Sequence, residues 1–122
     1  MVNRSKAKGT HFEPLVTDFL RLKFPHARRA TLTGNIDRGD VTGVPGLTVQ
    51  CKNQKSVSLG AWVDASKDQA ANACADFAVV VHKRVGKANA SEQFATMPLG
   101  DFARLYAAYV KMARDLDAAL DQ

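Results

Sequence analysis

The chain has 122 residues, of which 46% are hydrophobic and 24% are charged. This length suits one domain around one core, and no apolar run approaches the roughly 20 residues that a membrane-spanning helix needs. The composition therefore predicts a single globular domain over residues 1–122 and excludes an integral membrane protein.

Positive charge is in excess and unevenly distributed. Lys and Arg number 17 against 12 Asp and Glu, for a net charge of +5. Basic residues crowd the first 55 positions, which favours a polyanionic partner. A solvated surface accounts for the charge equally well. We expect residues 1–8 to form a basic N-terminal arm and residues 113–122 an acidic C-terminal tail.

The cysteines and the N-terminus bear on the compartment. Cys51 and Cys74 are too few for a disulfide scaffold and lack zinc-site spacing. A secretion signal has an apolar stretch followed by a cleavage site of small residues, and the N-terminal segment does not show this pattern. We therefore expect a reducing compartment and a cytoplasmic protein.

The first half of the chain predicts a helix followed by strands. Apolar residues from Phe12 to Leu20 recur at helical spacing and Pro25 ends the pattern, which indicates a helix over 9–24. A turn at Val44-Pro45-Gly46 separates two of the β-compatible segments that follow. These segments predict a small antiparallel meander. Its strands are expected at 28–33, 37–44 and 47–52.

The second half predicts another helix and a buried strand. An Ala-rich segment indicates a helix over 60–74, and the apolar run from Phe77 to Val81 is typical of a central strand covered on both faces. A short strand at 93–97 and a final helix entered at 98–101 complete the order α-β-β-β-α-β-β-α. This order predicts an α/β fold with a mixed sheet flanked by helices. The segment from 47 to 82 is long enough for a β-α-β crossover.

Residues 39–52 contain the most informative pattern. Because side chains alternate along a strand, Gln50 and Lys52 point to one face and Cys51 to the other. If Asp40 lies on a neighbouring strand, its carboxylate sits beside them. Oxygen ligands can hold a hard cation, and an ammonium can offset charge on a phosphate. The pattern is compatible with metal-dependent cleavage of a nucleic-acid backbone, whereas an arbitrary Asp and Lys are more often surface residues.

Four segments, in this order and spacing, resemble the PD-(D/E)XK nuclease superfamily, and within it the small archaeal-type and phage Holliday junction resolvases. The resemblance covers about residues 8–105. It implies a restriction-endonuclease-like fold and a Mg²⁺-dependent endonuclease, with Mn²⁺ as a substitute, that cuts four-way DNA junctions as a homodimer in a phage or prokaryotic cell. The matching segments are Lys8-Gly9-Thr10-His11-Phe12-Glu13, Gly39-Asp40-Val41-Thr42-Gly43, Val49-Gln50-Cys51-Lys52-Asn53 and Val80-Val81-His82-Lys83-Arg84.

The resemblance also implies roles for single residues. Asp40 is implied as the metal-binding aspartate, Gln50 as the second ligand and the backbone carbonyl of Cys51 as the third. Lys52 is implied as the catalytic lysine. Glu13 is similar to a first-helix glutamate that supports the metal site.

Gln50 departs from the family pattern, which usually has Asp or Glu there. A neutral amide holds a cation less firmly unless Glu13 or Asp37 supplies the missing carboxylate. Three functions stay open: a junction resolvase, a related nuclease acting on duplex, flap or nicked DNA, and a DNA-binding relative that does not cut.

Other polar side chains are candidates for contacts to DNA, and each is also compatible with ordinary surface charge. Gln69 among them resembles a glutamine that lines the site in several branches of the superfamily. Trp62 is expected to be a packing residue between helix and sheet. The DNA-binding candidates are Lys6, Lys8, Arg28, Arg29, Thr33, Arg38, Lys55, Gln69, Lys83 and Arg84.

Overall fold

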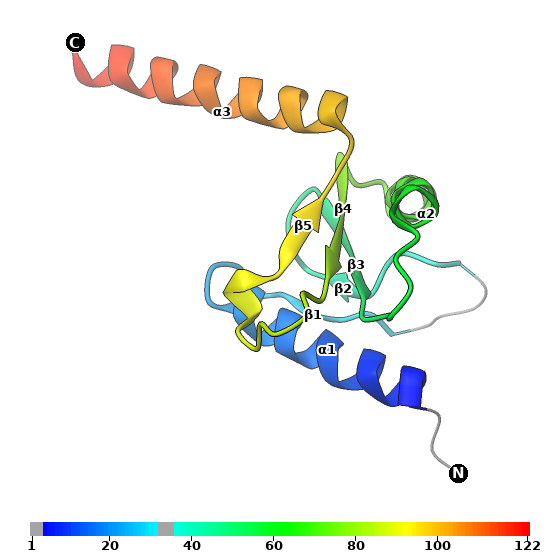
Figure 1. The fold of residues 1–122 in the computed structure, drawn as a ribbon. Coiled ribbons are helices and arrows are strands. Elements are labelled where there is room, and N and C mark those ends of the chain that lie inside the picture. The colour runs from blue at the N-terminus through cyan, green and yellow to red at the C-terminus, as the bar shows by residue number, and fades with distance from the viewer. Residues whose placement is uncertain (1–3, 32–35) are drawn as a thin grey trace.

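The computed structural model describes the backbone of residues 4–31 and 36–122, and the side chains of these ranges from residue 11 onward. Helices and strands follow one another in the predicted order, with one 3-10 turn added before the last strand (Figure 1). The elements are α1 (Arg4–Arg21), β1 (Arg28–Arg29), β2 (Val41–Thr42), β3 (Leu47–Lys52), α2 (Leu59–Asn72), β4 (Phe77–His82), η1 (Ala90–Glu92), β5 (Phe94–Thr96) and α3 (Leu99–Leu120).

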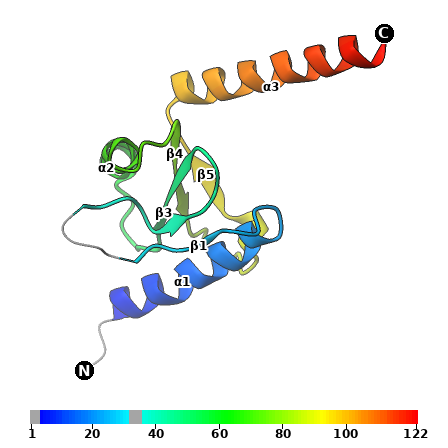
Figure 2. The same cartoon turned by 180° about the vertical axis from the view of Figure 1, so that it is seen from behind.

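The described strands form one mixed sheet in the order β1-β2-β3-β4-β5. β3 and β4 are parallel, and the other neighbours are antiparallel. The predicted meander and the parallel connection through α2 are both confirmed. The fold is α/β, with α1 and α2 on opposite sides of the sheet (Figures 1 and 2).

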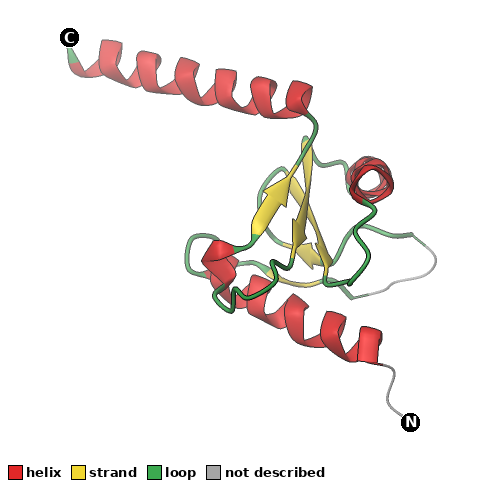
Figure 3. Ribbon diagram, in the orientation of Figure 1, coloured by secondary structure: helices red, strands yellow, loops and turns green. Residues whose placement is uncertain are grey.

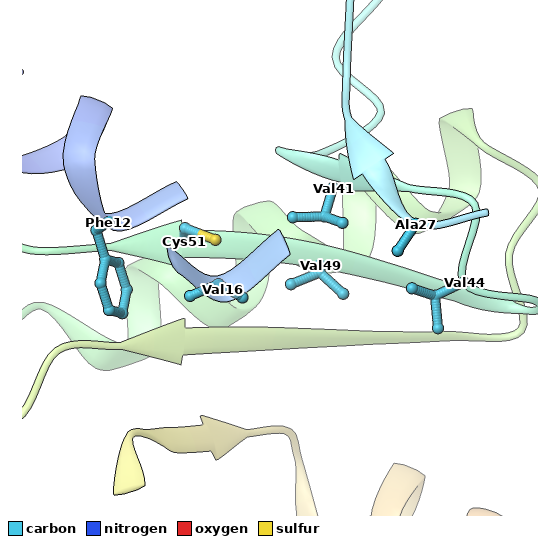
Figure 4. Packing of buried hydrophobic residues seen from close by; sticks show 7 residues of the cluster. All are labelled: Phe12, Val16, Ala27, Val41, Val44, Val49 and Cys51. Carbon is cyan, nitrogen blue, oxygen red and sulfur yellow. The ribbon is translucent and has the colours of Figure 1, made fainter. Parts of the chain in front are cut away.

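The main core lies between α1 and one face of the sheet. Phe12 and Val16 of α1 pack with Val49 and Cys51 of β3 in one cluster of buried side chains (Figure 4). Val49 is 1% exposed. Burying a side chain of this size stabilises the fold by about 1.5–3 kcal/mol. The side chains of Val49 and Cys51 therefore lie in the core, and those of Gln50 and Lys52 lie on the opposite face of the sheet.

The other face of the sheet packs on α2. Thr48 of β3 and Val80 of β4 are buried there, together with Trp62 and Ala70 of α2. Trp62 is therefore a packing residue between helix and sheet, as predicted. β4 has a strand on each side, but β3 is the middle strand of the five in the described sheet.

Two strands are much shorter than predicted, and β5 is shorter than the expected 93–97 by one residue at each end. The segments expected at 28–33 and 37–44 contribute only β1 and β2 to the described sheet. Gly39 and Gly43, with φ of +93° and +83°, bound β2 and break the extended conformation on both sides. Thr33 lies outside the described residues.

The first helix also differs from its prediction. α1 begins at Arg4, so residues 4–8 of the expected N-terminal arm are helical. It ends at Arg21 instead of residue 24. The chain then turns, since the amide of Phe24 still donates to the carbonyl of Leu20 at 2.8 Å.

α3 extends away from the sheet and from the other two helices (Figures 1 and 3). It has 22 residues and none of them is buried. Much of the predicted acidic tail thus forms the end of this helix. None of the helices in the described ranges combines the length and hydropathy needed to cross a bilayer.

Candidate functional site

Asp40 is held at the start of β2 by backbone hydrogen bonds to two strands. Its amide donates to the carbonyl of Val49 at 2.8 Å, and its carbonyl accepts from the amide of Ala30 at 2.8 Å. The preceding residue must be a glycine for two reasons. Gly39 has a φ of +93°, and a Cβ at this position would lie 2.6 Å from Cγ2 of Thr48. The position of Asp40 is therefore set by the meander.

The Asp40 side chain continues the hydrogen-bond ladder of the sheet. Its Oδ2 atom accepts from the backbone amide of Cys51 at 2.7 Å. The other oxygen, Oδ1, has no hydrogen-bond partner among the described residues. A carboxylate fixed in this way presents one oxygen to a ligand.

Gln50 and Lys52 lie on the same side of the sheet as Asp40. Val41 pairs with Val49, so the register places Asp40 opposite Gln50, with Lys52 two residues further along β3. The Cys51 side chain points the other way, into the core. The structure thus brings Asp40, Gln50 and Lys52 together, as the alternation of β3 predicts.

Lys52 is oriented by an aromatic ring. Its Nζ atom lies 5.9 Å from the centroid of the Trp62 ring, a cation–π contact from the α2 side. Trp62 in turn lies 6.4 Å from the ring of His82, at a tilt of 51°. The ammonium is therefore supported at one edge of the packed α2 face.

Two further carboxylates lie close to Asp40. Glu13 of α1 forms an ion pair with Arg29 of β1 at 2.9 Å. Asp37 accepts hydrogen bonds from the amide of Gly39 at 2.9 Å and from Nε2 of Gln69 at 2.8 Å. The site therefore combines three carboxylates from α1 and the segment before β2.

These surroundings disfavour the charge of Asp40. Burial raises the pKa of Asp40 to about 6, and the negative charges of Glu13 and Asp37 act in the same direction. The amide of Cys51 and the ammonium of Lys52 oppose them. Burial also raises the pKa of the Cys51 thiol. That thiol is neutral at pH 7, so only the backbone of Cys51 is suited to bind a cation.

Two buried amide oxygens have no donor among the described residues. They are Oε1 of Gln50 and Oε1 of Gln69. A buried polar atom without a hydrogen-bond partner lowers the stability of the fold by about 1–3 kcal/mol. Such an atom is usually satisfied by a ligand, a water molecule or an ion. Gln50 lies opposite Asp40 in the strand register, and Gln69 is joined to the same site through Asp37.

Charged side chains of both signs line a depression beside Asp40. Its volume is about 660 Å³. The arginines make it suitable for phosphates, and the carboxylates make it suitable for a cation. Its charged lining residues are Glu13, Arg28, Arg29, Asp37, Arg38 and Asp40.

The remaining DNA-binding candidates do not gather there. Lys83 donates from Nζ to the carbonyls of Arg84 and Lys87, and Arg84 donates to the carbonyl of Glu92 at 3.0 Å. Both cations thus stabilise the loop after β4. Lys55 is exposed between β3 and α2. Lys6 and Lys8 lie on α1, but their side chains lie outside the described part of the structure.

Sequence reasoning missed part of the support around Asp37. Asn72 donates from Nδ2 to the carbonyl of Asp37 at 2.9 Å, next to the Gln69 contact. Gln69 and Asn72 are three residues apart on one helix, so they share a face. This spacing could have predicted that Gln69 and Asn72 lie on one helix face, but nothing in the sequence indicated that this face contacts Asp37.

No family model, curated protein or solved structure matches the chain with significance. Among the residues with described side chains, no group of three or more His, Cys, Asp and Glu is arranged to hold a metal ion. A cation at Asp40 would accordingly need amide or backbone oxygens as well as carboxylates.

Proposed function

We propose that this chain is a metal-dependent DNA endonuclease with a restriction-endonuclease-like fold. The observation that carries the proposal is the half-buried carboxylate of Asp40, which lies opposite Gln50 in the strand register and near the ammonium of Lys52. The Oε1 atom of Gln50 has no donor among the described residues. The sequence resemblance assigns these same positions to the site of a PD-(D/E)XK nuclease.

The residues fit a hard divalent cation such as Mg²⁺ or Mn²⁺. Asp40, Gln50 and the carbonyl of Cys51 would hold it, with Glu13 or Asp37 adding negative charge nearby. This fit is supported by Oε1 of Gln50, a buried atom with no donor among the residues whose side chains are described. When bound, the cation supplies Lewis-acid polarisation of a phosphate and a more acidic attacking water.

Lys52 and the arginines act on the phosphate directly. The Lys52 ammonium can stabilise negative charge that builds on the phosphate as the bond breaks, and it lies 5.9 Å from the centroid of the Trp62 ring. Arg28 and Arg38 line the depression and can hold neighbouring phosphates. Arg29 instead orients Glu13 through their ion pair.

The preferred substrate is a four-way DNA junction, cut by a symmetric homodimer. Paired cuts on opposing strands need two sites related by a two-fold axis, and one copy of this fold has one such site. Cleavage of duplex, flap or nicked DNA, and binding without cleavage, are the competing functions.

A cleavage assay on synthetic DNA tests the proposal. Wild-type protein with Mg²⁺ or Mn²⁺ should cut a labelled four-way junction faster than a linear duplex of the same sequence, and chelation should stop it. Asp40→Ala and Lys52→Met should each lower the rate by roughly 100-fold or more, because charge stabilisation in the site is lost, while junction affinity is kept. The matched controls Asp68→Asn on α2 and Lys111→Met on α3 should cut at the wild-type rate.

The outcomes separate the competing functions. Equal rates on junction and duplex would contradict junction specificity and leave a general nuclease. No product with either metal, at a protein concentration that binds the junction, would overturn the nuclease proposal in favour of a binding module.

Gln50→Glu tests the metal geometry. A carboxylate at this position adds charge to the cation site, so we expect Mg²⁺ to bind at least as tightly as in wild type. The measurement is a calorimetric titration with Mg²⁺ alone. A large loss of affinity would show that residue 50 does not face the cation.

A further inference from the structure

α3 carries an apolar stripe that the rest of the described chain leaves uncovered. Its members recur at alternating spacings of four and three residues, the heptad pattern of paired helices. Tyr106 is 55% exposed and Tyr109 is 63% exposed. The stripe consists of Phe102, Tyr106, Tyr109, Ala113, Leu116 and Leu120.

The aromatic part of the stripe is already ordered. The rings of Phe102 and Tyr106 stack with centroids 6.1 Å apart and planes at 15°. Tyr106 and Tyr109 follow at 5.8 Å and 31°. A row of rings on one helix face presents a large contact area at low entropic cost, as interfaces require.

The stripe does not pack on the sheet of its own chain. Only Met97 and Pro98 separate β5 from α3. The first turns of the helix are tied to the body, since Arg104 donates to the carbonyl of Asp76 at 3.1 Å and lies 4.2 Å from the centroid of the Phe77 ring. The helix direction is thereby set, and its later turns extend outward (Figures 1 and 2).

We propose that α3 pairs antiparallel with α3 of a second copy of this chain. One antiparallel register matches every layer of the stripe. In it Phe102 faces Leu120 of the partner, Tyr106 faces Leu116, and Tyr109 faces Ala113. The large ring of Tyr109 lies against the smallest side chain of the stripe, so the packing is self-complementary.

Charge favours this occupant, and the helix dipoles favour this direction. α3 carries three acidic residues and three basic ones, whereas helices that lie on membranes are rich in Lys and Arg on their polar face. Asp101 lies at the start of the helix, the basic residues follow it, and Asp115 and Asp117 come after them. Antiparallel pairing brings the Asp117 end of one helix toward the end of the other that carries both Asp101 and Arg104, so the charges there are mixed. The direction is favoured by the helix dipoles, which oppose one another in an antiparallel pair and add in a parallel one.

The available area suits a stable pair. The exposed parts of the stripe, with Leu105 and Met112 at its edges, amount to roughly 800 Å² on each copy. A standard interface buries about 800 Å² per partner. Most helical stability in proteins comes from the packing of an apolar helix face, so the pair also stabilises α3 itself.

Sedimentation equilibrium of the full chain tests the pairing. We expect a dimer at micromolar concentration, and Tyr106→Asp should weaken its association by roughly 100-fold or more, since a charge would be buried in the seam. Ala107→Asp is the matched control, because it adds the same charge at the next, exposed position on the other face. It should remain dimeric. Circular dichroism and the unfolding midpoint establish that both variants keep the α/β body.

Each other result would overturn the proposal. A monomeric wild type would show that α3 does not pair. A tetramer would contradict a simple pair. A dimer unaffected by Tyr106→Asp would place the interface elsewhere.

Cysteine cross-linking tests the direction. In a Cys74→Ser background, Phe102→Cys and Leu120→Cys proteins are mixed and oxidised. An antiparallel pair gives the mixed disulfide, because two copies of residue 102 then lie roughly 27 Å apart along the helices. Disulfides between identical variants only would show parallel pairing and overturn the proposed register.

The pairing is independent of the nuclease chemistry. A dimer that cuts no DNA would contradict the proposed function and leave the α3 pair intact. A monomer that cuts DNA would contradict the α3 pair and the homodimer proposed for junction cleavage, and would leave the nuclease chemistry intact.

Discussion

Asp40 is a carboxylate kept in surroundings that oppose its charge. It is clamped by the meander, its Oδ2 atom accepts from the amide of Cys51, and Glu13 and Asp37 are close by. Fold stability alone would favour a neutral side chain here. A costly charge that the backbone holds in place is typical of a functional site.

This cost should appear in the pH dependence of stability. The pKa of Asp40 is raised from 3.8 to about 6, so the folded protein keeps a proton that the unfolded chain loses between these values. The contribution of Asp40 to the free energy of unfolding should therefore be highest below pH 3.8 and fall as pH rises to about 6, by at most about 3 kcal/mol. Asp40→Asn should be more stable than wild type at pH 7.5 without divalent cations and equal to it near pH 4.

Urea unfolding at a series of pH values measures the difference. The exposed Asp68→Asn variant is the control and should follow wild type throughout. A constant gap between Asp40→Asn and wild type from pH 4 to 7.5 would show that Asp40 is not the group responsible. Mg²⁺ at neutral pH should reduce the difference in stability between Asp40→Asn and wild type, because the cation binds the ionised carboxylate of wild-type Asp40.

At the scale of single residues, the alternation of β3 was enough to place Gln50 and Lys52 on one face and Cys51 in the core. The contact between Gln69 and Asp37 was not predictable in the same way. It joins residues 32 positions apart through a side-chain hydrogen bond. No local spacing specifies such a contact, because it depends on how α2 lies on the sheet.

The short strands β1 and β2 depend on close backbone approach. A Cβ at Gly43 would lie 2.0 Å from the carbonyl oxygen of His26, and the residue has a φ of +83°. Any other residue would push β1 away from β2. Because Asp40 also bonds to both sides of this meander, the element and the site share one constraint.

Gly43→Ala should therefore destabilise the fold by about 2–4 kcal/mol through strain and a steric clash. Gly60→Ala is the matched control. Gly60 lies in α2 with nothing within 4 Å of an added Cβ, so this change should be neutral or stabilise by up to about 1 kcal/mol. Thermal unfolding compares the two variants. Equal stabilities would show that β1 approaches β2 less closely than the structure has it.

At the scale of the whole molecule, positive charge is placed beside the carboxylates. Arg28, Arg29 and Arg38 line the depression that contains Asp40, although Arg29 is paired with Glu13. Arg28 and Arg38 form no ion pair with the residues whose side chains are described, so they can contact phosphates. Other cations, such as Lys83 and Arg84, support a loop instead.

DNA binding should accordingly weaken with salt, because phosphate contacts release counterions. Arg38→Ala should lower the slope of log affinity against log salt by about 1, whereas the same change at Arg114, on α3, should leave the slope unaltered. Fluorescence anisotropy with a labelled four-way junction at several salt concentrations gives both slopes. A change at Arg114 equal to that at Arg38 would contradict binding at the depression.

The order of elements, the two faces of β3 and the expected proximity of Asp40, Gln50 and Lys52 could be predicted from the amino-acid sequence. These follow from side-chain periodicity and turn residues, which act over a few positions. The folded chain was needed to show where the strands stop, which cations bind loop carbonyls and that α3 leaves the body with its apolar stripe exposed. These features depend on contacts between distant segments, whose geometry local propensity does not specify.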